Sequence, residues 1–101
     1  MAEFNGKYFL DIAHENGYEY GKRCYRKDGV GDDGNDCTIY YGGGWWFMGK
    51  NYDGLLDYSV KSDADEPPTS GWIVDSSGSG SPPQLVYAES DVPSFYVILD
   101  G

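Results

Sequence analysis

The sequence predicts an all-β fold: a single-domain antiparallel β-sandwich or small barrel of about eight short strands, with no substantial helix. Aromatic residues make up 17% of the 101 residues, whereas alanine, the best helix former, occurs only four times. Aromatic side chains fit a pleated surface, so this balance favours strands over helices. Fifteen glycines and five prolines supply turns between them. No stretch has a sustained apolar period of about 3.6 residues, which a helix would require.

Eight short apolar or alternating runs follow one another along the chain. We expect strands at residues 7–12, 18–26, 37–41, 44–49, 55–61, 71–75, 84–89 and 94–99. Turn-forming pairs separate many of these runs, among them Asn16-Gly17, Asp28-Gly29, Gly42-Gly43, Asp53-Gly54 and Pro67-Pro68. A spacing of about 10–12 residues from one strand to the next is typical of sandwiches and barrels.

The runs differ in how their apolar residues alternate. In run 18–26 one side of the expected strand carries Tyr18, Tyr20 and Cys24, and the other side carries Glu19, Arg23 and Tyr25. Because the second side is largely charged, the run predicts a half-exposed strand. Runs 44–49, 71–75 and 94–99 are apolar on both faces. Such strands are central and covered on both sides, or they keep one face for a ligand.

The chain has the length of one domain, and we expect a single all-β module over residues 1–101. Residues 1–4 are expected to be a disordered or expression-derived start. Residues 76–83 consist of serine, glycine and proline, a composition that predicts a flexible internal loop.

Seventeen acidic and seven basic residues give a formal net charge of −10. Nucleic acids and anionic membranes both attract basic proteins, so we expect neither as a partner. No apolar run approaches the roughly 18 residues of a membrane-spanning helix. The expected partner is a protein or a carbohydrate.

Cys24 and Cys37 are the only cysteines, and each lies near the end of an expected strand beside an acidic loop. Antiparallel neighbours could bring the two Cα atoms within disulfide range. Closing a loop of about 14 residues would stabilise the fold by about 3 kcal/mol. We expect the bridge, which would favour an extracellular location; two free thiols would favour the cytosol instead.

The loop between the cysteines carries four carboxylates, from Asp28, Asp32, Asp33 and Asp36. Calcium binds sets of six to eight oxygens in glycine-rich loops of this kind. The glutamate that an EF-hand has at its twelfth position is missing here, so we expect a solvated acidic turn. Calcium is kept as an alternative, and no other cofactor is expected.

No catalytic motif occurs in the chain. There is no Gly-x-Ser-x-Gly elbow, and the single histidine, His14, has no second histidine or cysteine near it in the sequence. We expect His14 on the surface and the protein to be non-enzymatic. A small hydrolase using a pair of carboxylates is the third-ranked alternative, because seventeen acids specify no particular pair.

Two glycine- or proline-marked segments hold all three tryptophans. Adjacent residues on a strand point to opposite faces, so Trp45 and Trp46 cannot share a layer. We expect one of them to pack in the core with Trp72 and the other to bind a ligand. The candidate ligand-binding residues are Tyr40, Tyr41, Trp45, Trp46 and Trp72. In the carbohydrate alternative these rings stack on sugars, with hydrogen bonds from Asn51, Asp53 and Asp57.

Several short motifs occur together in one order: Asn5-Gly6-Lys7-Tyr8, Tyr25-Arg26, Trp45-Trp46, and Pro67-Pro68-Thr69-Ser70-Gly71-Trp72. In this order the chain resembles a family of small Tyr/Trp-rich all-β modules within large multidomain eukaryotic proteins. Those modules have an N-G-x-Y opening, a central Y-x-W stretch and a late P-P-x-x-G-W box. The resemblance spans about residues 5–90. It implies a binding or architectural module without catalytic residues, and it does not include the cysteine pair or the acidic loop.

Overall fold

The computed structural model of the chain describes residues 2–31, 34–52, 56–75, 78, 80–87 and 94–99. Over these residues the fold is all-β, as the sequence predicts, and its only helices are two single 3₁₀ turns. Within the same ranges no helix has the length and apolar character needed to cross a membrane.

The described residues form ten strands. In chain order they are β1 (Gly6–Leu10), β2 (Tyr18–Glu19), β3 (Lys22–Arg23), β4 (Tyr25–Lys27), β5 (Cys37–Gly42), β6 (Trp45–Lys50), β7 (Leu56–Lys61), β8 (Ile73–Val74), β9 (Pro83–Tyr87) and β10 (Ser94–Leu99). The 3₁₀ turns are η1 (Ala2–Phe4) and η2 (Glu15–Gly17).

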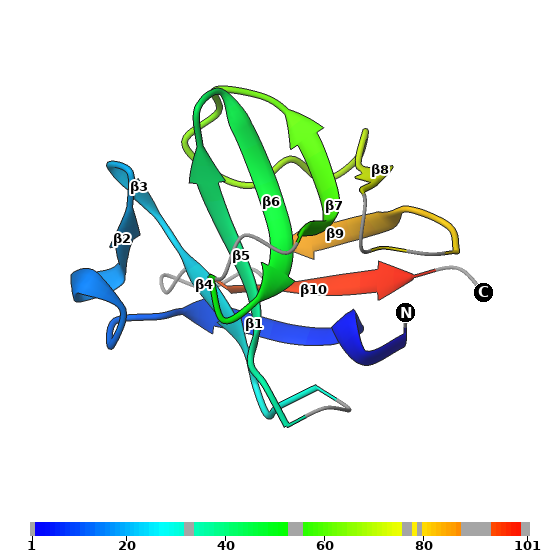
Figure 1. Cartoon of the computed structure of the whole chain (residues 1–101), viewed down its shortest axis with the longest axis horizontal. Coiled ribbons are helices and arrows are strands. Elements are labelled where there is room, and N and C mark those ends of the chain that lie inside the picture. The colour runs from blue at the N-terminus through cyan, green and yellow to red at the C-terminus, as the bar shows by residue number, and fades with distance from the viewer. Residues whose placement is uncertain are drawn as a thin grey trace.

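Eight of the strands form one antiparallel sheet in the order β8-β7-β6-β5-β4-β1-β10-β9, and β2 pairs with β3 as a separate hairpin. The sheet curls so that β5, β6 and β7 cross over β1, β10 and β9 (Figure 1). Its two end strands approach each other through the segment before β8. The backbone N–H of Leu85 in β9 donates to the carbonyl of Thr69 at 2.9 Å. The result is a nearly closed, barrel-like sheet.

The proline- and tryptophan-containing box at residues 67–72 forms the join between the two ends of the sheet. Besides the bond to Thr69, the hydroxyl of Tyr87 donates to the carbonyl of Pro67. The indole Nε1 of Trp72 donates to the carbonyl of Pro68 at 2.8 Å, so its N–H is satisfied although the ring is buried. This box therefore stabilises the closed sheet.

The core lies on the inner face of the curled sheet. Its buried residues are Phe4, Tyr8, Tyr25, Cys37, Ile39, Trp46, Met48, Tyr58, Val60, Trp72, Leu85, Phe95 and Val97. Trp46 is fully buried and donates from Nε1 to the carbonyl of Ala64 at 3.0 Å. Trp45 is only partly buried, because the alternation along β6 turns it to the opposite face. The prediction that the two tryptophans face opposite ways is confirmed.

The segment predicted as one strand at 18–26 is three short strands. A two-residue turn at Tyr20-Gly21 separates β2 from β3, with Glu19 paired to Lys22, and β4 begins after Cys24. Both turn residues have positive φ, 49° and 82°. Tyrosine is not a turn-forming residue, so the sequence carried only the glycine as a signal.

The start of the chain also differs from expectation. Residues 2–4, expected to be disordered, form η1, and the side chain of Phe4 is fully buried against Tyr58 with ring centroids 5.9 Å apart. Of the loop expected at 76–83, residues 76, 77 and 79 lie outside the described ranges. Its last residue, Pro83, is buried at the start of β9.

The predicted disulfide between Cys24 and Cys37 is wrong, because neither of these two buried cysteines forms a disulfide. The β4–β5 register pairs Tyr25 with Ile39, which sets Cys24 and Cys37 three positions apart along the ladder. That offset is about 10 Å, beyond the reach of a disulfide. Cys37 belongs to the core, whereas the thiol of Cys24 lies 4.0 Å from the carbonyl of His14. The extracellular expectation, which depended on the bridge, loses its basis.

Candidate functional site

The outer face of β5 and β6 is aromatic as well. Tyr40 and Phe47 are paired across the two strands, with ring centroids 5.7 Å apart and planes inclined by 46°. Their neighbours in sequence, Ile39 and Trp46, are fully buried on the inner face. Strand alternation therefore turns one side of each strand into the core and the other side away from it, where Tyr40 is still buried, at 8% exposure, and Phe47 is partly exposed.

The β2–β3 hairpin places a third ring beside these two. Tyr20, at the tip of the hairpin, is 76% exposed and lies over Gly42 at the end of β5. A Cβ built on Gly42 would lie 3.5 Å from a ring carbon of Tyr20 and 3.5 Å from one of Phe47. The glycine thus leaves a space between the two rings that a longer side chain would fill.

Tyr52, in the turn after β6, supplies the fourth ring. Its centroid is 5.3 Å from that of Tyr40, with the planes inclined by 59°. One face of Tyr52 stacks on the imidazole of His14 at 3.8 Å, and its hydroxyl donates to Asp11 at 2.9 Å. Burial, together with its contacts to Cys24 and Asp11, raises the pKa of Tyr52 far above its usual value. The ring is therefore neutral and fixed in place.

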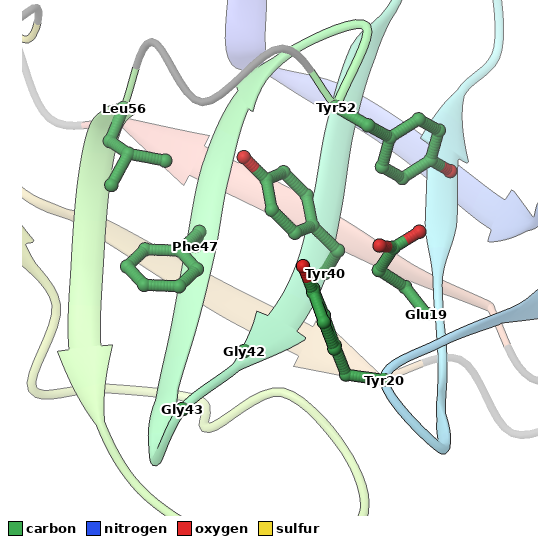
Figure 2. A pocket seen from close by; sticks show the side chains of 8 residues that line it. All are labelled: Glu19, Tyr20, Tyr40, Gly42, Gly43, Phe47, Tyr52 and Leu56. Atoms are coloured by element: carbon green, nitrogen blue, oxygen red, sulfur yellow. The ribbon is translucent and has the colours of Figure 1, made fainter.

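These four rings surround a cavity of about 560 Å³ that is open to solvent (Figure 2). We call it the aromatic cavity. Glu19 lies between Tyr52 and Tyr20 in this view, and it is the only charged side chain among the described residues that line the cavity (Figure 2). These described lining residues are Glu19, Tyr20, Tyr40, Gly42, Gly43, Phe47, Tyr52 and Leu56.

A second cavity, of about 340 Å³, lies on the other side of Tyr52. We call it the polar cavity, because its lining includes two carboxylates and an arginine. Arg26 lies 3.7 Å from Asp11 and 3.9 Å from Asp36. The lining is Asp11, Ala13, His14, Arg26, Asp36, Thr38, Asn51 and Tyr52. Tyr52 is thus a shared wall with a different chemistry on each side.

Unfavourable backbone conformations are concentrated around the two cavities. In the described part of the chain, the non-glycine residues with positive φ are Glu15, Asn16, Tyr20, Asn51 and Tyr52. Three of them line a cavity, and the other two directly follow His14. A left-handed conformation destabilises a side-chain-bearing residue by about 1–2 kcal/mol, and such strain is most often found at binding or catalytic sites.

Two neighbouring turns show how unusual Tyr20 is. The β5–β6 turn has Gly43 and Gly44 at its two central positions, with φ of 58° and 89°. The β2–β3 turn has nearly the same φ values but places Tyr20 before Gly21. Asparagine or glycine is preferred at that first position, because both adopt positive φ easily. At this position the chain therefore has an exposed aromatic side chain in place of a residue that would make the turn more stable.

One group of potential metal ligands borders the aromatic cavity. Ligand atoms of His14, Glu15 and Glu19 all lie within 4.8 Å of one another. The Nε2 of His14 is already paired with Oε2 of Glu19. His14 was expected on the surface, but stacking on Tyr52 leaves its side chain only 27% exposed. No local sequence pattern indicates this contact, because His14 and Tyr52 are far apart in the chain.

The residues that were expected to form one ligand-binding site lie in different parts of the structure. Tyr40 lines the aromatic cavity and Asn51 the polar one. Trp46 and Trp72 are core residues, so their assignment to the ligand site is wrong. Trp45 is partly exposed but lines neither of the two cavities.

Of three further candidate ligand-binding residues, two line neither cavity and the third lies outside the described residues. Tyr41 packs against Trp46 with centroids 5.7 Å apart, and its hydroxyl bonds the carboxylate of Asp63, which raises the pKa of the phenol. Asp57 is buried, at 3% exposure, and is not available to a sugar. Asp53 lies outside the described residues. The hydrogen-bonding set of the carbohydrate alternative is therefore not assembled around one ring.

The acidic loop is described only in part. Asp28 is exposed, and Asp36 pairs with Arg26 and accepts a backbone hydrogen bond from Asn51 at 3.0 Å. Asp32 and Asp33 lie outside the described residues. The calcium alternative stays a prediction.

Comparison of the chain with protein-family models, with curated proteins and with solved structures finds no match. The resemblance to the Tyr/Trp-rich modules stays a prediction.

Proposed function

We propose that the protein is a non-catalytic binding module and that its ligand occupies the aromatic cavity. One observation carries the proposal: rings from the β2–β3 hairpin, from β5–β6 and from the turn after β6 converge on one open cavity. Its volume of about 560 Å³ is within the range of about 300–1,000 Å³ that is usual for ligand sites.

The energetics of Tyr20 support the same proposal. With 76% of its surface exposed, this residue gains little from burial in the free protein. Its positive φ adds strain that glycine or asparagine would not have. A ring that is strained and exposed in the free protein can bury apolar area when a ligand enters the cavity.

The side chains around the cavity favour binding over turnover. Among the described residues, the lining contains no serine, cysteine, threonine or lysine, and its one carboxylate, that of Glu19, is paired with His14. The nearest thiol, Cys24, is buried, and that burial raises its pKa, so it is protonated and unreactive at neutral pH.

The carbohydrate alternative fits the ring geometry less well. A sugar stacks on the open face of a ring, whereas Tyr40 is only 8% exposed, His14 covers one face of Tyr52, and Phe47 and Tyr52 are inclined to Tyr40 by 46° and 59°. Inclined rings form the sides of a concave site and suit a compact group better than a flat sugar face.

A fragment screen by ligand-observed NMR tests the proposal. Small apolar and aromatic fragments should bind the wild-type protein and lose binding in Gly42→Val, whose side chain fills the space between Tyr20 and Phe47. The Cβ of the new valine meets these rings only at ordinary contact distance, and valine suits a strand, so the variant should fold.

A matched pair of tyrosine substitutions locates the site. Tyr20→Asn removes the ring but installs the preferred Asn-Gly turn, and it should weaken fragment binding. Tyr96→Ala removes another exposed tyrosine, 45% exposed on β10 and absent from the cavity lining, and should leave binding unchanged. Equal binding by wild type, Gly42→Val and Tyr20→Asn would refute the proposal.

A further inference from the structure

The charge in the described lining of the aromatic cavity is negative. Glu19 is the only charged residue among the eight described residues that line it. Its carboxylate pairs with His14 through Oε2, which holds it in place beside Tyr52 and Tyr20 (Figure 2). An anionic ligand would meet this fixed carboxylate, and a cationic one would be attracted to it.

The nearby basic residues are already paired with acids. On β3, the Nζ of Lys22 donates to the carbonyl of Asp63 at 2.8 Å and to Asp65 at 3.2 Å. Arg23 lies 3.3 Å from Glu66. These two basic residues line a different hollow, which shares no lining residue with the aromatic cavity. They do not offset the negative charge of the cavity wall, and the whole chain carries a formal charge of −10.

The rings themselves favour a cation. The face of an aromatic ring carries negative electrostatic potential, and a cation within about 6 Å of the ring centre is attracted to it. Tyr40 and Tyr52 have their centroids 5.3 Å apart, and Tyr40 and Phe47 5.7 Å apart. At these spacings the rings touch one another, so a cation lies in the open cavity beside them, where it can contact the exposed parts of more than one ring.

We propose that the aromatic cavity binds the methylated ammonium group of a lysine side chain in a basic peptide. This inference rests on the proposed function and names its ligand class. An unmodified ammonium brings three N–H donors, and the described lining offers them tyrosine hydroxyls and one charged acceptor, Glu19, which is already paired with His14. A trimethylated ammonium has no N–H to satisfy and presents methyl groups to the rings.

The surroundings favour a peptide over a free small cation. The cavity is larger than an ammonium head group needs, which leaves room for the lysine stem. The polar cavity adjoins it across Tyr52, and its carboxylates, Asp11 and Asp36, outnumber its one arginine. A basic residue flanking the methylated lysine can contact that second cavity.

Isothermal titration calorimetry with four probes tests the inference. The probes are one basic peptide with trimethyllysine, the same peptide with unmodified lysine, the same peptide with the uncharged tert-butyl isostere of trimethyllysine, and tetramethylammonium alone. We expect the trimethyllysine peptide to bind about tenfold more tightly than the isostere, because only the cation attracts the ring faces and Glu19. Unmodified lysine and tetramethylammonium should both bind more weakly than the trimethyllysine peptide.

Two variants assign the binding to the cavity. Glu19→Gln should weaken the trimethyllysine peptide severalfold while leaving the isostere unchanged, since it removes charge and keeps shape. Tyr20→Asn should weaken both peptides, and Tyr96→Ala neither. Circular dichroism checks that each variant is folded.

The contradicting outcomes separate the two proposals. Equal affinity for trimethyllysine and its isostere, with both lost in Tyr20→Asn, would overturn the cation inference and keep the binding module. If the protein binds fragments in the cavity but binds none of the peptides, the cation inference is also overturned and the binding module is kept. Tighter binding of tetramethylammonium than of the peptide would overturn the peptide as its source. If Tyr20→Asn and Gly42→Val bind the peptide with the same affinity as the wild-type protein, both proposals for this cavity are overturned.

Discussion

The two faces of β5 and β6 use the same kinds of residue for different purposes. On the inner face Ile39, Trp46 and Met48 are fully buried, and the indole N–H of Trp46 has its hydrogen-bond partner. On the outer face Tyr40 and Phe47 border an open cavity. Aromatic content alone therefore does not separate core from binding surface. The distinction comes from what lies against each face: a closed sheet on one side and a single two-stranded hairpin on the other.

The largest expected effect is on the inner face. Trp46→Ala should lower the free energy of unfolding by about 3–5 kcal/mol, because it leaves a large cavity in the core. Phe47→Ala, on the outer face, should lower it by no more than about 2 kcal/mol, since its ring is already partly exposed. Urea denaturation measures both, and Trp46→Phe serves as a milder inner variant if Trp46→Ala does not fold. Equal losses from the two alanine variants would remove the distinction between the faces.

Alkaline pH tests the inner face separately. Burial raises the pKa of Tyr8, and burial with the hydrogen bond to Glu66 raises that of Tyr25, both well above the usual value. Above pH about 10 the unfolded state loses these protons and the folded state keeps them, so folding stability must fall as pH rises. The loss should be about 1.4 kcal/mol per pH unit for each residue.

Denaturant midpoints at pH 8 to 11, with tyrosinate absorbance, measure this loss. The buried phenols should ionise together with unfolding. Their ionisation in a protein that is still folded would show that the inner face is open to water.

Substitution of Tyr52, the shared wall of the two cavities, should have an intermediate effect on the free energy of unfolding. Tyr52→Phe removes the hydroxyl that donates to Asp11 at 2.9 Å and leaves a carboxylate that is only 7% exposed with one donor fewer. A hydrogen bond to a charged group contributes about 1.5–3 kcal/mol, and Arg26 nearby should keep the loss at the lower end. Thermal denaturation of Tyr52→Phe against Tyr96→Phe, an exposed control, checks this. No difference between them would mean that Asp11 does not hold the ring.

The smallest effect has the opposite sign. Tyr20→Asn should raise the free energy of unfolding by up to about 1 kcal/mol, because asparagine adopts the positive φ of this turn more easily than tyrosine. Gly43→Asn, in the neighbouring β5–β6 turn, replaces one suitable residue with another and should change stability by less than about 0.5 kcal/mol. A loss of stability in Tyr20→Asn comparable to that of Phe47→Ala would show that the ring of Tyr20 serves folding.

The sequence predicted those parts of the fold that local alternation controls. The opposite orientation of Trp45 and Trp46 follows from the period of two along a strand, and the strand at residues 94–99 lies where the apolar run predicts it. The all-β class follows from composition in the same way. These features depend on neighbours in the chain, which a sequence displays directly.

The site was less predictable, because long-range contacts build it. Tyr40 was expected to bind a ligand, but Tyr20 was assigned to a continuous strand, since tyrosine gives no turn signal. The stacking of His14 on Tyr52 joins segments that no local pattern connects. The disulfide prediction was wrong for the same reason: Cys24 and Cys37 lie near strand ends, but the β4–β5 register sets them apart.

The most direct test of the central claim is NMR chemical-shift mapping during titration with the trimethyllysine peptide. We predict shift changes at the amides of Gly42, Gly43 and Glu19 and at the rings of Tyr40 and Phe47, with the indole N–H signals of Trp46 and Trp72 unchanged. Changes centred on those two indoles, or on β9 and β10, would contradict the assignment of the outer face of β5 and β6 as the binding surface.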